Sequence, residues 1–218
     1  LWSRGLGDVY KRQALDYPWD KWAVFLHPAQ AELTTKNFTG PARVSGSAGT
    51  GKTIVALHRA VQLAKNNPKA KILLTTFSKA LANALNKKLK LLAGDSADLM
   101  NRIYVDAINS VAYDLYAKAY GQPNITSLSV VRSTLVKAAA NLEGHKFTPQ
   151  FLVSEWSEIV DAWQLKSWEA YRDVTRLGRK TRVGGKQREI LWQIFEETRK
   201  SLVERKLVTW SDIFGKLT

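Results

Sequence analysis

The chain of 218 residues contains no cysteine and only 3 histidines. Without thiols it can form neither a disulfide framework nor a cysteine-based zinc site, and few imidazoles remain to bind a metal. It also lacks any apolar run approaching the roughly 20 residues that a membrane-spanning helix needs. These absences exclude disulfide-stabilised and membrane-spanning proteins, and they favour a cytoplasmic protein, in the bacterial cytosol or nucleoid, with no membrane partner.

Acidic residues are scarce as well, because 19 Asp and Glu stand against 33 Lys and Arg. The resulting charge of +14 and the isoelectric point near 10.0 indicate a polyanionic partner, most simply nucleic acid. A basic protein without such a partner stays open as the alternative. The remaining composition, with 45% hydrophobic residues, is that of a chain able to bury a core, and nothing in it indicates an obligate oligomer.

The two ends of the chain resemble the edges of a fragment. Residues 1–13 show no helix or strand periodicity, and their GLGDVYKRQ portion resembles translated sequencing-adapter sequence. The first residue is Leu1, and the only methionine is Met100. We therefore expect residues 1–13 to be a non-native or disordered tail outside the fold.

The most informative motif is GSAGTGKT, residues 46–53, which lies between an apolar run and a helical pattern. Residues 42–45 predict a short strand before it, and the apolar residues from Ile54 to Ala64 form one face of a helix behind it. Such a loop turns backbone N–H groups toward phosphates, and the dipole of the following helix adds to the attraction. The motif therefore predicts a site for a nucleoside triphosphate.

Two side chains of this motif carry the chemistry. Lys52 suits the β- and γ-phosphates, and the hydroxyl of Thr53 suits a Mg²⁺ ion. We predict Lys52 and Thr53 as the catalytic residues and Thr53 as the metal ligand. The predicted nucleotide-binding residues of the loop are Gly46, Ser47, Ala48, Gly49, Thr50, Gly51, Lys52 and Thr53.

Around this loop the pattern alternates between helix and strand. Beyond the elements that flank the loop, helices are predicted over residues 28–36, 78–92 and 106–116, and strands over residues 71–77 and 102–105. The strand over residues 71–77 reads as buried, with Ser78 as the cap of the next helix. This alternation favours the α/β class, with a parallel sheet and crossover helices.

From residue 129 onward the sequence shows only helical periodicity. The predicted helices cover residues 130–142, 149–163, 168–177 and 187–206. Most of the 8 tryptophans lie in this half of the chain. We expect them to be core residues rather than base-stacking platforms, because Trp156 and Trp163 are spaced to share one helical face.

Three segments resemble motifs of superfamily 1 helicases. Residues 26–30 (LHPAQ) resemble the Q motif and stand at its usual distance ahead of the glycine loop. Residues 75–82 (TTFSKALA) resemble motif Ia of the UvrD/Rep-type branch, and residues 105–112 (VDAINSVA) stand where that branch has motif Ib. The resemblance covers the chain from about Asp16 to Leu217. It implies a partial RecA-like P-loop domain, residues 14–125, followed by an all-helical insertion subdomain, residues 126–218.

The resemblance also implies a function. A UvrD/Rep-type DNA helicase uses ATP and Mg²⁺ to drive 3′-to-5′ movement on single-stranded DNA and unwinding at junctions with duplex, as in DNA repair, and RNA stays open as a further partner. By this likeness Gln30 reads the adenine edge. Ala107 and Asn109 depart from the usual Thr and His of motif Ib, and Ile54 replaces an Arg that often follows the loop. The residues predicted to contact nucleic acid are Thr76, Phe77, Ser78, Lys79, Asn109 and Ser110.

A basic cluster in the helical half predicts further contacts with DNA. Between Arg172 and Arg188 the only acid is Asp173, and glycines interrupt the helical pattern, so that part of the charge lies on a loop. Such a cluster can follow a phosphate backbone, and the resemblance places it near the duplex junction. We predict contacts from Arg176, Arg179 and Arg182, with a solvated charged face as the alternative.

An ATPase also needs a carboxylate on a second strand to organise magnesium and water. Asp106 follows an apolar run, but Ala107 leaves no adjacent acid, and we favour Asp106 as a helix N-cap. In UvrD/Rep-type helicases the acidic pair follows the helical insertion. This implies that it lies beyond Thr218 and that the fragment alone is inactive. Two alternatives stay open: a compact P-loop nucleotide-binding protein that uses Asp106, and a non-catalytic nucleic-acid-binding module.

Overall fold

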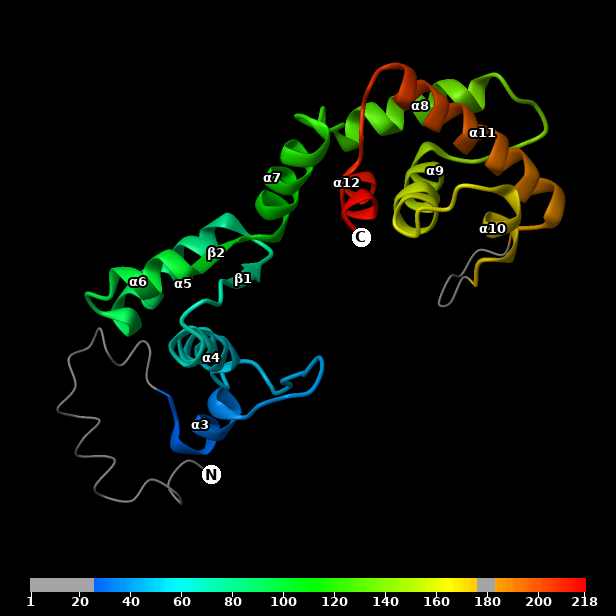
Figure 1. Ribbon diagram of the computed structural model, residues 1–218. Helices are drawn as coiled ribbons and strands as arrows, with labels where there is room; N and C mark the ends of the chain where they lie inside the picture. Colours follow the sequence, from blue (N-terminus) through cyan, green and yellow to red (C-terminus); the bar gives the residue numbers. More distant parts are fainter. Residues whose placement is uncertain (1–25, 176–182) are drawn as a thin grey trace. The chain divides into compact units, whose positions relative to one another are not determined.

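The computed structural model describes residues 26–175 and 183–218 (Figure 1). The chain divides into two units, Leu1–Ile108 and Asn109–Thr218. The predicted tail of residues 1–13 lies outside the described residues, as do Arg176, Arg179 and Arg182. The domain boundary near residue 125 that the helicase motifs imply stays a prediction.

The first unit is an α/β structure with a small parallel sheet. Strands β1 and β2 pair from Ile72 opposite Ile103 to Thr76 opposite Ala107. The connection between them runs through helices, as predicted for a parallel pair. In chain order its elements are α3 (Pro28–Thr35), α4 (Lys52–Asn66), β1 (Ile72–Thr76), α5 (Lys79–Ala93), α6 (Ala97–Arg102) and β2 (Ile103–Ala107).

The core of this unit lies where α4 and α5 pack on the sheet. The predicted apolar face of α4 is confirmed, because Leu57, Val61 and Ala64 are buried in this core. Side chains from α5 and from alternate positions of β2 complete it, among them Leu89 and Val105. Burying a leucine of this kind stabilises the fold by about 1.5–3 kcal/mol. The pattern of apolar residues therefore predicted this core correctly.

Two strand predictions for this unit are wrong in whole or in part. Residues 42–45 are exposed and form no strand, because a strand needs a hydrogen-bonded neighbour and the described sheet contains only β1 and β2. The predicted strand over residues 71–77 exists, but it is not buried on both faces. Leu73 and its partner Tyr104 are 52% and 51% exposed, because α4 and α5 pack on the side chains of the opposite face.

Helix α6 was not predicted from the sequence. Its N-cap is Ser96, whose hydroxyl accepts a hydrogen bond from the backbone N–H of Leu99 at 3.4 Å. At its other end Arg102 donates to the carbonyls of Ala64 and Asn67, at 2.6 and 3.1 Å. These carbonyls belong to the end of α4, where a cation is favourable. Arg102 therefore ties α6 to α4 instead of beginning a strand.

The second unit is helical, as predicted. Its elements are α7 (Ile108–Tyr120), which begins at the last residue of the first unit, α8 (Leu128–Ala140), α9 (Pro149–Glu155), the π-helix η1 (Trp156–Asp161), α10 (Trp168–Asp173), α11 (Gly185–Glu204) and α12 (Trp210–Leu217). A parallel bridge between Ile125 and Val208 is the one piece of β-structure in its described residues. No helix in the described part of either unit is long and apolar enough to cross a membrane.

Aromatic side chains form the core of the second unit. The Tyr171 ring lies 5.6 Å from the rings of both Trp192 and Phe195, and its hydroxyl donates to the buried carboxylate of Glu155 at 3.0 Å. Trp156 and Trp192 are buried, as expected for core tryptophans. The expectation is wrong for Trp163, which is 68% exposed. A π-turn holds one residue more than an α-turn, so Trp163 no longer shares a face with Trp156.

The last helix, α12, was also missed. Thr209 and Asp212 form a reciprocal capping box at its start, and Ile213 is fully buried against Ala112 and Tyr116 of α7. The sequence does contain a signal for this helix, since TWSD has the spacing of a capping box ahead of apolar residues. Helix α12, the last element of the second unit, therefore packs against α7, the first, in one small apolar cluster.

Candidate nucleotide and nucleic-acid site

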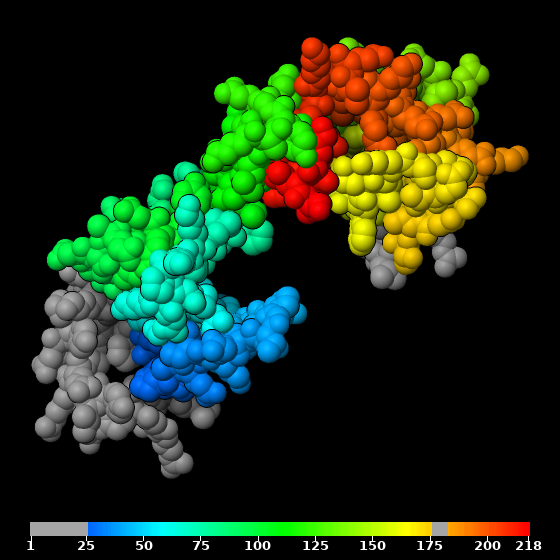
Figure 2. Space-filling model, viewed as in Figure 1, coloured from blue at the N-terminus to red at the C-terminus, as the bar shows by residue number. Residues whose placement is uncertain are grey.

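The glycine loop, residues 46–51, extends beyond α3 and α4 and is visible at the surface (Figure 1, Figure 2). Gly49 and Gly51 have φ angles of 78° and 79°, a left-handed conformation that favours glycine. Gly51 accepts the first backbone hydrogen bonds of α4, from Ile54 and Val55. Because Gly51 has no side chain that could cap the helix, the first N–H groups of α4 stay accessible to an anion.

Lys52, the first residue of α4, folds back over this loop. Its ammonium group donates to the carbonyls of Gly46 and Ser47, at 2.9 and 2.6 Å, and lies 3.4 Å from the Thr50 hydroxyl. A Cβ at Gly46 would lie 2.9 Å from that hydroxyl, so the loop closes tightly around the ammonium group. A compact, cationic loop of this kind fits a phosphate group.

Thr53 is exposed in the first turn of α4, beside Lys52. Its hydroxyl is therefore accessible to a metal ion held between the loop and a bound nucleotide, as the motif predicts. Within residues 26–175 and 183–218 no three His, Cys, Asp or Glu side chains come close enough together to hold a metal ion. Thr53 fits the role of a metal ligand through its position at the start of the helix.

The structure brings Gln30 to the glycine loop. Its side-chain amide donates to the carbonyl of Thr50 at 2.7 Å, across 20 residues of sequence. A Cβ at Gly51 would lie 3.4 Å from the same amide nitrogen, so a glycine there allows the close approach. The predicted reader of adenine, on α3, is thus in contact with the predicted phosphate loop.

A contact that the sequence did not reveal holds α3 against α4. Arg59, on α4, donates to the carbonyls of Leu33 and Lys36 at 3.1 and 2.9 Å, and its guanidinium lies 4.7 Å from the centre of the Phe38 ring. An arginine on a predicted amphipathic helix is ordinarily read as solvent-facing, so the pattern gave no signal for this role. Arg59 fixes the end of α3 opposite to the glycine loop.

The segment predicted to touch DNA lies where β1 meets α5. Phe77 is 96% exposed, and Thr76 closes the strand beside it. Ser78 caps α5, as predicted, by accepting from the N–H of Leu81 at 3.2 Å. This cap fixes the backbone at Ser78, directly after the exposed Phe77. A contact of these residues with nucleic acid stays a prediction.

Lys79 makes an ion pair with Asp106 that the sequence analysis did not foresee. Its ammonium lies 2.7 and 2.8 Å from the two carboxylate oxygens, which also accept from the Tyr104 hydroxyl at 3.1 Å and from the N–H of Ala107 at 2.6 Å. The hydrogen bond from Lys79 is the main reason that the pKa of Asp106 is lowered, against the effect of desolvation.

The prediction that Asp106 caps the next helix is wrong. Asp106 lies within β2 and is only 7% exposed. Its carboxylate binds Lys79 and residues of its own strand rather than the first turn of α7. The alternative role of a magnesium ligand would require the same carboxylate oxygens, which already accept four hydrogen bonds from three residues. Asn109 and Ser110 follow in the first turn of α7, partly buried, in the second unit.

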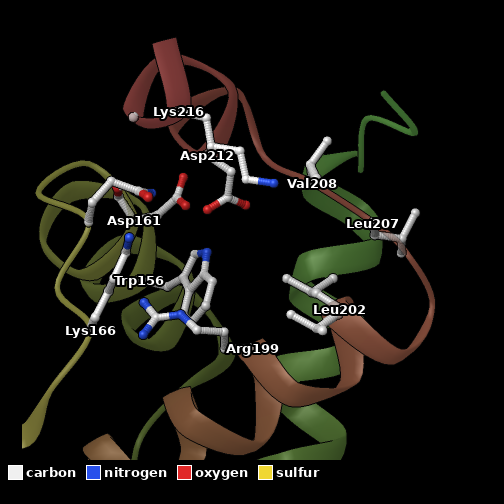
Figure 3. Close-up of a pocket in the computed structure, with 12 residues that line it drawn as sticks. Trp156, Asp161, Lys166, Arg199, Leu202, Leu207, Val208, Asp212 and Lys216 are labelled. Atoms are coloured by element: carbon white, nitrogen blue, oxygen red, sulfur yellow. The ribbon is translucent and has the colours of Figure 1, made fainter. Parts of the chain in front are cut away.

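The second unit contains a separate charged cavity of about 350 Å³ (Figure 3). Asp161 and Asp212 lie on its α12 side, and Arg199 lies beside Trp156. Burial raises the pKa of Asp161 and lowers that of Arg199. The Thr209 hydroxyl donates to Asp161 at 2.7 Å, so the start of α12 rests on the carboxylate at the end of η1. None of these charged residues was predicted from the sequence.

An exposed glycine loop at the start of a helix, with Lys52 folded over it and Gln30 against it, is typical of P-loop nucleotide-binding proteins of the α/β class. The model of the UvrD/REP helicase N-terminal domain matches residues 26–218. The chain therefore belongs to the UvrD/REP helicase family, whose members are in general ATP-dependent helicases that act on nucleic acids. The resemblance to this family is confirmed, and the individual motif assignments stay predictions. A search of curated proteins gave no match.

Proposed function

We propose that this chain forms the ATP-binding part of a 3′-to-5′ DNA helicase, which couples ATP hydrolysis to movement on single-stranded DNA and to duplex unwinding. The contact between the Gln30 amide and the Thr50 carbonyl carries the proposal. The Gln30 side chain suits an adenine edge, and the loop suits phosphates. The amide nitrogen of Gln30 lies 2.7 Å from the Thr50 carbonyl oxygen, so both can contact the same nucleotide.

Different groups of the loop and of the start of α4 bind ATP and Mg²⁺. Lys52 exchanges the carbonyls of Gly46 and Ser47 for the β- and γ-phosphate oxygens, which offer it a full opposite charge instead of a dipole. The N–H groups at the start of α4 stabilise phosphate charge, and the Thr53 hydroxyl takes one position on the metal. When bound, Mg²⁺ neutralises charge that develops on the transferred phosphate.

The attraction between this chain and nucleic acid is largely electrostatic. The net charge of +14 favours a polyanion, and the predicted contacts at Thr76, Phe77, Ser78 and Lys79 surround the edge where β1 ends. We propose that Asn109, Ser110 and the basic residues Arg176, Arg179 and Arg182 add contacts from the second unit. In this proposal residues 14–125 are the P-loop domain and residues 126–218 its helical insertion.

We further propose that the 218-residue chain by itself hydrolyses ATP very slowly. Hydrolysis requires carboxylates that hold Mg²⁺ and orient the attacking water. The aspartate within strand β2, Asp106, is hydrogen-bonded to Lys79 and Tyr104 instead. Binding of ATP needs only the loop, and is therefore expected without turnover.

Nucleotide binding by Lys52→Ala tests this function directly. The substitution removes the charge aimed at the phosphates, and we expect the affinity for Mg²⁺–ATP, measured by titration calorimetry, to fall at least about tenfold. Lys65→Ala is the matched control, because Lys65 is exposed on the last turn of the same helix. Equal ATP affinity in Lys52→Ala and the unmodified chain would contradict the proposed nucleotide site.

A further inference from the structure

Helix α3 has very little apolar contact to hold it in place. Of its residues, Pro28–Thr35, only Thr34 is buried, and the Thr34 hydroxyl satisfies the carbonyl of Ala31 within the same helix. A helix of eight residues is not stable by itself in water and depends on its neighbours. The position of Gln30 therefore depends on polar contacts between α3 and the rest of the first unit.

Among the described residues two such contacts are present, one toward each end of the helix. Toward its start Gln30 donates to Thr50 of the loop, and at its end Arg59 donates to the carbonyls of Leu33 and Lys36. The Arg59 bonds use carbonyls that the end of a helix leaves without an intrahelical partner, and the cation faces the negative end of the helix dipole. Phe38, just beyond the helix, lies against the same guanidinium.

We propose that Arg59 is a positioning residue for base recognition, which sets the register of α3 on α4 and thereby holds the Gln30 amide at the nucleotide site. This inference rests on the proposed function, because it assumes that Gln30 faces the base of a nucleotide held by the loop. Arg59 itself touches neither the loop nor Gln30 in this structure; its contacts are with the last turn of α3 and with Phe38.

The mechanism makes base recognition and phosphate binding separable. Lys52 and Thr53 lie in α4, Gly51 is the N-cap of that helix, and Lys52 donates to the carbonyls of Gly46 and Ser47. The loop therefore keeps these contacts when α3 shifts, although it loses the hydrogen bond from Gln30. The Gln30 amide moves with α3, and a glutamine must meet both a donor and an acceptor on the adenine edge to distinguish it from guanine. Loss of the Arg59 contacts should therefore reduce the preference for ATP over GTP while leaving the affinity for a bare phosphate chain unchanged.

The experiment compares three ligands in the 218-residue chain: Mg²⁺–ATP, Mg²⁺–GTP and Mg²⁺–tripolyphosphate, each by titration calorimetry. Gln30→Ala should lower the ATP-to-GTP affinity ratio by up to about tenfold, the value of one hydrogen bond, without changing tripolyphosphate binding. Arg59→Met should reproduce this pattern. Arg59→Lys, which keeps a donor and the charge, should retain most of the preference.

Lys65→Met, the exposed change on the same helix, serves as the matched control and should leave all three affinities unchanged. A wild-type ATP-to-GTP ratio in Arg59→Met, with the ratio lost in Gln30→Ala, would overturn the positioning role and leave the proposed function intact. Equal losses of ATP and tripolyphosphate affinity in Arg59→Met would also overturn it, since the loop itself would then depend on Arg59. A chain that binds none of the ligands would refute both.

Discussion

The two units of the protein are stabilised in different ways. The second unit packs Tyr171, Trp192 and Phe195 into one aromatic core, with α8 and the helices 149–161 and 185–204 around it. The first unit has a smaller aliphatic core and a sheet face with Leu73 and Tyr104 half exposed. Its predicted site residues are held by hydrogen bonds, as for Gln30, or by an ion pair, as for Lys79. The contrast indicates that the site depends on polar contacts more than on core packing.

The largest expected effect comes from breaking the aromatic core. Phe195→Ala removes a ring that is 1% exposed, and the second unit should lose about 3–5 kcal/mol of stability, because the surrounding helices cannot close the cavity. Denaturant unfolding followed by tryptophan fluorescence measures this loss. Val203→Ala, at a 67% exposed position of the same helix, should change stability by less than about 0.5 kcal/mol. Similar losses in both variants would contradict the assignment of the core.

In the first unit, the ion pair of the buried Asp106 offers the corresponding test. Asp106→Asn replaces a carboxylate that accepts from Lys79, Tyr104 and Ala107, and we expect a loss of about 1–3 kcal/mol. Hydrogen exchange of the amides in β1 and β2 would report the change. Asp95→Asn, at an exposed position, is the control. Unchanged protection in Asp106→Asn would mean that the ion pair contributes nothing to this unit.

Asp106 and Asp161 should contribute to the pH dependence of their units with opposite signs. The pKa of Asp106 is lowered in the fold, so the stability it contributes is present above its unfolded value of about 3.9 and is lost as the pH falls through the folded value. Burial raises the pKa of Asp161, so the folded second unit holds that proton more tightly than the unfolded chain, and its stability decreases as the pH rises above about 3.9.

Hydrogen exchange between about pH 3 and 6 measures, in one series, how the stability of each unit changes with pH. Asp106→Asn should flatten the slope of the first unit alone, and Asp161→Asn that of the second alone. A slope that either variant leaves unaltered would show that its aspartate does not cause the pH dependence of that unit.

The smallest effect concerns binding of single-stranded DNA. Neutralising Arg176, Arg179 and Arg182 together should weaken binding for all sequences alike and reduce the salt slope by about 2, since each phosphate contact to a single strand contributes about 0.7. Fluorescence anisotropy at several salt concentrations measures the slope. If the triple variant retained the full slope, the cluster would be only a solvated face.

The sequence predicted the helices and the site motifs better than it predicted their surroundings. The apolar face of α4, the Ser78 cap and the glycine loop are local signals, and the structure has α4 and the Ser78 cap where the pattern puts them. The strand over residues 42–45 failed because strands depend on partners that no local pattern reveals. Trp163 was misplaced because nothing in the sequence signals the π-turn before it.

The contacts that complete the site are long-range and polar. Gln30 with Thr50, Arg59 with Leu33, and Lys79 with Asp106 join residues at least 20 positions apart in the sequence. Periodicity indicates which side chains face a core, but not which carbonyl an arginine reaches. Which residues serve the nucleotide stays a prediction from the motif, whereas the contacts that position these residues were found only in the structure.

We propose that the first unit binds ATP through its glycine loop and that Asp106 pairs with Lys79 rather than with a catalytic metal. Steady-state phosphate release by the 218-residue chain and by Asp106→Asn, alongside ATP binding, tests it most directly. We predict that the unmodified chain binds ATP and that neither protein shows appreciable turnover. Robust turnover that disappears in Asp106→Asn would contradict the claim and identify Asp106 as the carboxylate of a complete ATPase.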